Sequence, residues 1–186
     1  MLSEKQLVKQ CAKHDRCAQK QLFDRYSGLL LGICRRYVAE TSEAEDILQE
    51  GFLKIYLKIR EYKGTGPLMA WMTRIIINTA ITHYHKNRKH HFHYDIEEVN
   101  ETDMEGFMFN DLDFTHDELL NVIGSLPQGY RMIFNLYAVE GFKHKEIAEL
   151  LEIDVNTSKS QYSRSRKLIR KKLENLSKAH NIKGKK

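Results

Sequence analysis

The sequence predicts an all-α protein with two small helical domains joined by a flexible acidic linker. Three observations favour this fold class. Proline is nearly absent, with two residues in 186, so few positions interrupt a helix. Apolar residues recur at the three- and four-residue spacing of amphipathic helices over most of the chain. A stretch without lysine or arginine, residues 90–130, separates two more basic parts.

The charge of the chain is compatible with a polyanionic partner. The formal net charge is +5 and the pI is about 9.0. Cys11, Cys17 and Cys34 form no C-x-x-C pair, which argues against a disulfide framework or a zinc finger. Cys34 is expected on an apolar helix face. The N-terminus lacks an apolar signal core and no stretch reaches membrane-spanning length, so we expect a cytoplasmic protein.

The first domain is expected to occupy residues 1–92. A first amphipathic helix is marked by Leu22, Tyr26, Leu29, Leu30, Ile33 and Tyr37. Ser42 and Glu45 have the S-x-x-E spacing of a capping box and predict the start of the next helix. The side chains predicted to be buried by that second helix are Ile47, Leu48, Phe52, Ile55, Tyr56 and Ile59.

The start of this second helix is acidic. Two interpretations remain open for that charge. Acidic side chains stabilise the positive end of a helix dipole, and they could equally form a docking surface. The polar residues concerned are Glu43, Glu45, Asp46, Gln49 and Glu50.

A loop at residues 63–67 precedes a third helix, predicted over about 68–86. Trp71, Ile75, Asn78 and Thr82 follow one helical track along it. At this spacing we expect Trp71 in the core, with base stacking as the alternative. Basic and aromatic residues are mixed along this helix and just beyond its end, a combination that suits single-stranded DNA. They are Arg74, Lys86, Arg88, Lys89, Tyr84 and Phe92.

Histidines also gather at this helix end. They are His83, His85, His90, His91 and His93. Their spacing fits no standard zinc pattern and no carboxylate is placed to join them, so a solvated basic helix end is the preferred interpretation.

Residues 93–114 are predicted to form the linker. Ten acidic residues and no lysine or arginine lie between His90 and Tyr130, a composition typical of flexible segments. The segment from Asp95 to Asp113 is expected to occupy a positively charged channel of a partner. Apolar residues in this part favour a short helical or docked piece: Phe107, Met108, Phe109, Leu112 and Phe114.

The second domain is expected over residues 115–179, followed by a basic tail at 180–186. Thr115 and Glu118 form a T-x-x-E capping box that opens a short helix ending near Ile123. A break at Leu126–Pro127 precedes a helix over about 128–140. Its side chains predicted to pack under the following helices are Met132, Ile133, Leu136 and Tyr137.

Residues 141–172 predict a helix-turn-helix. The first helix spans about 143–151, the turn 152–154, and Asp154 caps the second helix. No acidic residue lies between Val155 and Lys172. A solvated basic helix is the alternative, but the turn spacing and the polar helix start favour DNA binding. The polar residues near that start are Thr157, Lys159, Ser160, Ser163 and Arg164; Arg166, Lys167, Arg170 and Lys171 lie further along and suit phosphates or solvent.

Three runs together resemble the bacterial RNA polymerase sigma factors of the sigma-70 type, in the small extracytoplasmic-function (ECF) group. They are AEDILQEGFLKIYLKIREY at 44–62, GPLMAWMTRIIINTAITHYHKNRK at 66–89, and LPQGYRMIFNLYAVEGFKHKEIAELLEIDVNTSKSQYSRSRKLIRKKL at 126–173. The order and spacing of the runs make the resemblance specific.

The resemblance implies a promoter-specificity subunit without enzymatic activity or cofactor. The first domain corresponds to region 2, which docks on core RNA polymerase and opens the −10 element. The implied docking residues are Asp46, Gln49 and Glu50. The residues implied in −10 recognition and strand opening are Lys63, Thr65, Arg74, Asn78, Lys86 and Arg88, in a family run that also includes Trp71 and Ile75.

The second domain corresponds to region 4, which reads the double-stranded −35 element. The implied DNA-binding residues are Lys145, Asn156, Thr157, Lys159, Ser160, Ser163, Arg164 and Lys167. Three positions depart from the family pattern. Glu152 stands where glycine is usual, Ser158 where valine is usual, and Thr82 where an acid is frequent. We therefore expect a slightly different turn and looser packing at Ser158.

Two other classes of function remain as alternatives. An ordinary transcriptional regulator would leave the acidic helix face and the basic third helix without a role. A nuclease could use His83, His85 and His91, and a divalent-metal activity assay would reveal it. ECF relatives are commonly held by an anti-sigma factor, often in the membrane, so such a partner is also expected.

Overall fold

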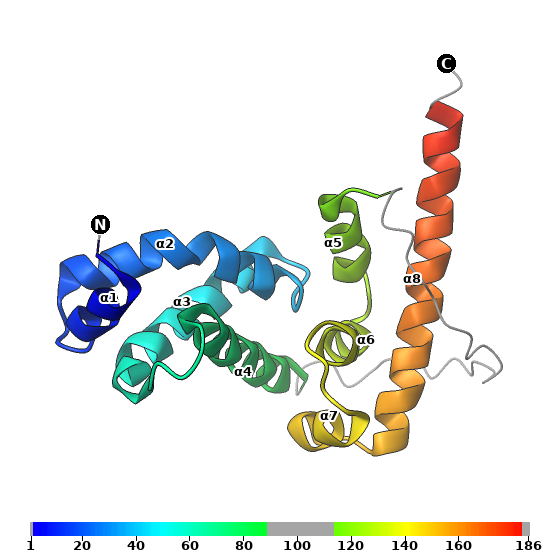
Figure 1. Cartoon of the computed structure of the whole chain (residues 1–186). Helices are drawn as coiled ribbons and strands as arrows, with labels where there is room; N and C mark the ends of the chain where they lie inside the picture. The colour runs from blue at the N-terminus through cyan, green and yellow to red at the C-terminus, as the bar shows by residue number, and fades with distance from the viewer. Residues whose placement is uncertain (1, 89–113, 184–186) are drawn as a thin grey trace. The chain divides into compact units, whose positions relative to one another are not determined.

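The computed structural model describes residues 2–88 and 114–183, and every regular element within these ranges is helical (Figure 1). The predicted all-α class is confirmed for this part of the chain. The chain divides into two compact units, Met1–Asn87 and Arg88–Lys186. Residues 89–113 lie outside the described residues. They include the linker as far as Asp113, the basic and aromatic residues Lys89 and Phe92, and the histidines His90, His91 and His93.

The first unit contains four α-helices and a 3-10 turn (Figure 1). They are α1 (Glu4–Cys11), α2 (Arg16–Arg35), α3 (Thr41–Lys58), η1 (Ile59–Glu61) and α4 (Leu68–Arg88). Helix α1, which the sequence analysis did not separate, begins with a capping box between Ser3 and Gln6. The Tyr26 hydroxyl donates to the Glu4 carboxylate at 3.0 Å and so ties α1 to α2.

The inner face of α2 is buried as the helical spacing predicts. Leu22, Leu30 and Cys34 are fully covered. Leu29 was predicted on the same face, but it is 63% exposed, because the packed stripe of α2 follows steps of four residues and bypasses this position. On the next helix, Tyr56 is only half-buried, and its hydroxyl donates to the Gln19 carbonyl at 3.0 Å.

The predicted capping box at the start of α3 is wrong. The helix begins at Thr41, with Glu40 as the preceding cap residue and no side-chain cap hydrogen bond. Ser42 is therefore already inside the first turn, where its hydroxyl cannot serve as the cap. The core side of α3 is nevertheless as expected, with Ile47, Leu48, Phe52 and Ile55 buried.

Helices α3 and α4 approach closely at Gly51. A Cβ placed on this glycine would overlap the side chain of Ile76. The buried face of α4 consists of Leu68, Met72, Ile76, Ile77, Thr79, Ala80, Ile81 and Tyr84. This packing leaves the opposite side of α4 to solvent, and it fixes which α4 side chains can meet a partner.

The second unit is also helical. Its elements are α5 (His116–Gly124), α6 (Gln128–Phe134), the π-helical segment η2 (Asn135–Val139), α7 (His144–Leu151) and α8 (Val155–Lys183). The capping box of Thr115 and Glu118 is confirmed, with both reciprocal hydrogen bonds present. The helix predicted over 128–140 is present, but its second half widens into the π-helical segment.

The core of the second unit joins α5, α6 and α8. Its buried members are Val122, Leu126, Phe134, Ile169 and Leu173, and Phe114 packs against them. The buried guanidinium of Arg131 donates to the carbonyls of Gly124 and Leu126, which closes the end of α5. These contacts hold α8 in place from its middle onward.

None of the helices in the described ranges 2–88 and 114–183 is both long and apolar enough to cross a bilayer.

Candidate functional site

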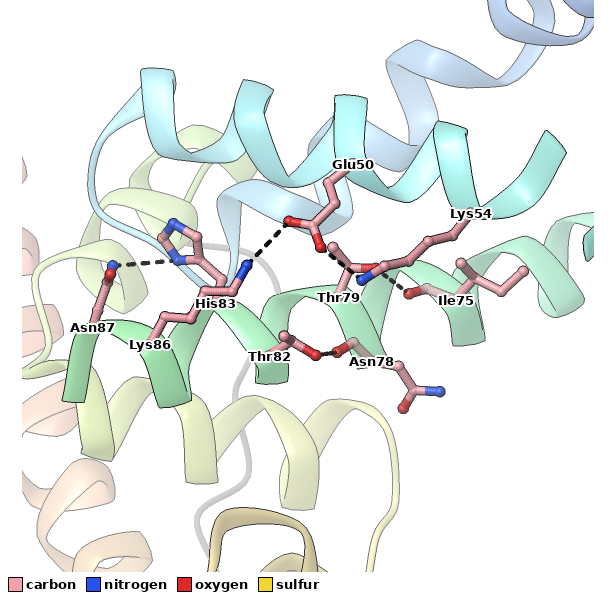
Figure 2. A network of polar contacts seen from close by, with 9 residues as sticks. All are labelled: Glu50, Lys54, Ile75, Asn78, Thr79, Thr82, His83, Lys86 and Asn87. Carbon is pink, nitrogen blue, oxygen red and sulfur yellow. Dashed lines mark hydrogen bonds and ion pairs between the residues drawn. The ribbon is translucent and has the colours of Figure 1, made fainter. Parts of the chain in front are cut away.

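One exposed stripe runs along α4. Arg74, Asn78 and Lys86 are exposed at spacings of four and eight residues, and Thr82 lies between the last two. The Thr82 hydroxyl donates to the Asn78 backbone carbonyl at 2.9 Å, and the exposed side-chain amide of Asn78 points away from this bond (Figure 2). Arg88 is the last residue of the helix. The structure thus brings Arg74, Asn78 and Lys86 onto one exposed side of α4.

The loop before α4 is held by Tyr62. Its hydroxyl donates to the Gly66 carbonyl, and its ring lies 5.6 Å from the Trp71 ring. Lys63 and Thr65 are exposed, and Gly64 takes a positive φ of 71° that favours glycine. A pocket beside this loop is lined by Glu4, Lys5, Val8, Tyr62, Lys63 and Gly64.

Two aromatic residues of α4 are placed differently from the expectation. Trp71 is half-buried rather than in the core, and its ring lies 5.6 Å from the tilted ring of Tyr62. Tyr84 was predicted to offer a stacking surface, but it is 8% exposed and belongs to the packed face of the helix. The aromatic contribution to the α4 surface therefore lies at Trp71.

The acidic start of α3 presents a second surface. Asp46 and Gln49 are exposed, and Glu50 is half-buried beside them. The same face continues into Leu53 and Leu57, which are 63% and 76% exposed. Their spacing of three and seven residues from Glu50 could have revealed this apolar extension in the sequence.

Glu50 is the centre of a polar network between α3 and α4 (Figure 2). Its carboxylate lies 2.8 Å from the Lys54 ammonium and 3.9 Å from the Lys86 ammonium. Lys54 also donates to the fully buried Thr79 hydroxyl at 3.2 Å, and Thr79 donates to the Ile75 carbonyl at 2.8 Å. The predicted docking acid is therefore linked to the exposed stripe of α4.

This network changes the acidity of Glu50. The hydrogen bond from Lys54 holds the pKa of Glu50 below its ordinary value, and the charges of Lys54, Lys86 and His83 act in the same direction. Burial opposes them without reversing the shift. Glu50 is therefore ionised at neutral pH, with its charge already directed toward lysines of its own unit.

The second unit contains the predicted helix-turn-helix. Helix α7 ends at Leu151, and Glu152 adopts the left-handed conformation, with φ 53° and ψ 51°. This explains why glycine suits the position, since a left-handed residue with a Cβ costs about 1–2 kcal/mol. Asp154 caps α8 by accepting from the Asn156 backbone N–H at 2.7 Å, as predicted.

The predicted DNA-contacting residues lie on the outer side of this motif. Their exposure falls into two groups. The exposed members are Lys145, Asn156, Lys159 and Ser160, and the half-buried members are Thr157, Ser163, Arg164 and Lys167. Asn156, Ser160, Ser163 and Lys167 form one helical stripe, which Lys171 continues.

The inner side of the motif has a polar contact that the sequence analysis missed. Ser158 is 0% exposed, and its hydroxyl lies 3.0 Å from Nδ1 of His144. The His144 ring stacks on Tyr137, with centroids 4.2 Å apart and planes at 15°. The expected looser packing at Ser158 is therefore wrong, because the histidine ring occupies the space beside the hydroxyl.

The two described histidines of α4 make local contacts. His83 Nδ1 lies 3.4 Å from the side-chain nitrogen of Asn87, and the His85 ring lies 5.8 Å from that of Tyr84. Within residues 2–88 and 114–183, no group of three histidine, cysteine or acidic side chains is arranged to hold a metal ion.

Comparison with known proteins gives matches to both units. Residues 22–90 match the family described as Sigma-70 region 2, and residues 116–169 match Sigma-70, region 4. The chain is 28% identical over 186 residues to the ECF RNA polymerase sigma-E factor of Haemophilus influenzae, covering 94% of this chain and 97% of the relative. It is also 28% identical over 183 residues to the RNA polymerase sigma-H factor of Pseudomonas aeruginosa, covering 93% and 95%.

One solved structure that aligns with the chain is that of the sigma factor RpoE in complex with the anti-sigma factor NepR from Bartonella quintana. Its TM-score is 0.48 at 22% identity, and the alignment covers 83% of this chain and 96% of that one.

Proposed function

Because the chain belongs to the ECF group of sigma-70-type RNA polymerase sigma factors, we propose specific roles for the surfaces of its two units. The first unit docks on core polymerase and opens the −10 element, and the second reads the −35 element. The observation that carries this assignment is the exposed stripe of Arg74, Asn78 and Lys86 on the helix that corresponds to region 2.

Strand opening is assigned to the α4 stripe and the loop before it. Arg74, Lys86 and Arg88 supply cations for phosphates, and the outward amide of Asn78 can donate to or accept from an unpaired base. Lys63 and Thr65 lie on the exposed loop, next to the pocket that Tyr62 helps to line. An unpaired base flipped toward this pocket would meet polar and apolar side chains together.

Core docking is assigned to the exposed face of α3. Asp46 and Gln49 supply its polar part, and Leu53 and Leu57 supply an apolar part. Glu50 is half-buried and paired to Lys54, so its role in docking includes keeping α3 and α4 in register. Exposed leucines beside charged residues are the composition of a protein interface.

Reading of the −35 element is assigned to the start of α8. The Asp154 cap fixes where α8 begins, and Lys159, Ser160 and Arg164 are the side chains with reach and hydrogen-bonding groups for base edges. Lys145, at the start of α7, is placed for a phosphate. Asn156, Thr157, Ser163 and Lys167 complete this surface.

The proposed activity is non-catalytic and needs no cofactor. The nuclease alternative would require His83 and His85 to act with metal or base partners; His83 lies against Asn87, and the His85 ring lies beside that of Tyr84. An anti-sigma factor remains a prediction drawn from relatives. The acidic segment from Asp95 to Asp113 remains a predicted channel-filling linker, in keeping with its charge.

Reconstitution with core RNA polymerase tests the proposal. The purified chain is mixed with core enzyme, the complex is isolated by gel filtration, and transcription is started on duplex DNA carrying a candidate promoter. Co-elution and promoter-dependent transcripts are expected. Failure to co-elute would contradict the docking role, and transcripts equal to those of core alone would contradict the role in initiation.

A further inference from the structure

A buried polar contact connects the two helices of the helix-turn-helix. Ser158 lies in the first turns of α8 and faces inward, fully covered, while its neighbours Thr157 and Lys159 face outward in part or in full. The Ser158 hydroxyl meets Nδ1 of His144, the first residue of α7, at 3.0 Å. The position of the contact is directly behind the side chains assigned to the −35 element.

The chemistry of the pair makes each member dependent on the other. A buried hydroxyl without a partner loses the hydrogen bonds that it made to water, and this loss exceeds the gain from an ordinary hydrogen bond. The imidazole ring is half-buried, so the loss of a partner at Nδ1 costs less than the loss of a partner at the hydroxyl. Replacing His144 therefore leaves a buried hydroxyl, and replacing Ser158 leaves a partly covered Nδ1, whereas replacing both by apolar groups of similar shape removes both requirements.

The orientation of His144 is fixed from other sides as well. Tyr137, in the π-helical segment, stacks on the ring at 4.2 Å, and the Tyr162 ring lies 5.8 Å from it. Tyr137 and Tyr162 also contact one another, with centroids 4.4 Å apart. Tyr162 is one turn beyond Ser158 on α8. The ring of His144 thus holds two successive turns of α8 against α7 and the segment before it.

We propose that His144 is a positioning residue for promoter recognition, which sets the angle of α8 through Ser158 and Tyr162 and so places Lys159, Ser160 and Arg164 on the −35 element. This inference rests on the proposed function of the second unit. It assigns no base contact to His144 itself. A rotation of the first turns of α8 by a fraction of a turn moves all of its outward side chains together. The preference for the correct base therefore falls at every base pair that these side chains contact, rather than at one base pair.

A double-mutant cycle in the full-length chain tests the inference. The variants are His144→Phe, Ser158→Val and the pair together, each combined with core polymerase. The measured quantity is the preference for a promoter with an intact −35 element over one with that element scrambled. Each single variant is expected to lose about tenfold in this preference, and the double variant is expected to return to within about threefold of the original chain.

The controls separate positioning from general stability. His180→Phe alters another histidine of α8, whose ring pairs with Glu118 at 2.8 Å, and it should leave the preference unchanged. Thermal unfolding and core binding are measured for every variant, since a merely structural role would lower the Tm without changing the preference of the folded protein.

The outcomes distinguish this inference from the proposed function. Lost preference in both single variants with recovery in the double variant supports the positioning role. A clear preference in the original chain that neither single variant alters, or a double variant that is worse than both, overturns the positioning role alone. No preference in the original chain overturns the −35 assignment of the second unit, and the positioning role with it.

Discussion

The Glu50 carboxylate lies 3.9 Å from the Lys86 ammonium, so an ion pair joins a predicted polymerase contact on α3 to a predicted DNA contact on α4. Lys54, at 2.8 Å from the same carboxylate, reinforces the link through its hydrogen bond to Thr79. Both lysines and Glu50 retain partial exposure. A protein partner that binds the Glu50 carboxylate, or a phosphate that binds the Lys86 ammonium, therefore competes with an ion pair inside the first unit.

Charge reversal on α3 should separate docking from stability. Asp46→Lys is expected to weaken binding to core polymerase by about tenfold, because an exposed acid of the interface becomes a like charge for a basic partner surface. The Tm of this variant should be unchanged. Glu50→Lys should weaken binding and should also lower the Tm by about 3 °C, since it places a cation beside Lys54 and Lys86.

Glu61→Lys is the matched control, because Glu61 is an exposed acid of the same unit that lies on η1 rather than on α3. Affinities are measured by titration of labelled core enzyme. If Glu61→Lys and Asp46→Lys weaken binding equally, the effect is one of net charge and the docking face is misassigned.

Strand opening is tested at Asn78. Asn78→Ala should slow open-complex formation on duplex promoters by about tenfold, because the outward amide no longer stabilises an unpaired base. A pre-melted template should restore most of the rate, since unpairing has already occurred. Fluorescence of a base analogue in the −10 element reports opening directly. Equal defects on duplex and pre-melted DNA would place the role of Asn78 elsewhere.

The second unit should become less stable in mild acid. Burial lowers the pKa of His144, and the positive charge of Lys159 acts in the same direction, while Tyr137 and Tyr162 cover its ring. The neutral ring is therefore the form favoured by folding. Its contribution is complete above pH 6.5 and is lost as the pH falls through the lower folded-state pKa.

Nuclear magnetic resonance of the imidazole protons measures this titration in the full-length chain, with the His144→Phe variant assigning the signal. The folded-state midpoint should lie below 6.5. A midpoint at or above that value would contradict the half-buried, neutral ring on which the sign of the effect depends.

Substitutions near the start of α8 and further along it should change DNA binding in different ways. Arg164→Ala should cost about 1–3 kcal/mol and change the preferred base, because an arginine contact to a guanine edge carries sequence information. Lys171→Ala should weaken all sequences alike and reduce the salt slope by about one unit, since it releases one counterion fewer. Binding of the holoenzyme to a randomised −35 library at two salt concentrations measures both. A uniform loss for Arg164→Ala would make it a phosphate contact instead.

Much of the fold was predictable from local signals. The capping box at Thr115, the cap at Asp154 and the limits of α7 depend on short-range hydrogen bonds, which residue types specify directly. The turn was expected to differ slightly at Glu152, whereas Glu152 keeps the left-handed conformation that glycine favours. Such features need no knowledge of distant parts of the chain.

The sequence-based predictions are wrong where tertiary packing determines which side chains of a helix are buried. Leu29 has helical spacing to the core yet is exposed, and Tyr84 lies among basic residues yet is buried, because neighbouring helices select one face of each helix. The pairing of His144 with Ser158 joins residues fourteen positions apart, so neither residue alone predicts it. Leu53 and Leu57 have the spacing that continues the face of Glu50, but only the packed structure shows that they are exposed rather than part of the core.

Selection of promoters from a random library by the reconstituted holoenzyme tests the central claim most directly. DNA that supports initiation is recovered and sequenced for the original chain, for Asn78→Ala and for Arg164→Ala. We predict two enriched elements at a fixed separation, with the downstream element weakened only by Asn78→Ala and the upstream one altered only by Arg164→Ala. A single enriched element, or two variants that change the same element, would contradict the division of promoter reading between α4 and α8.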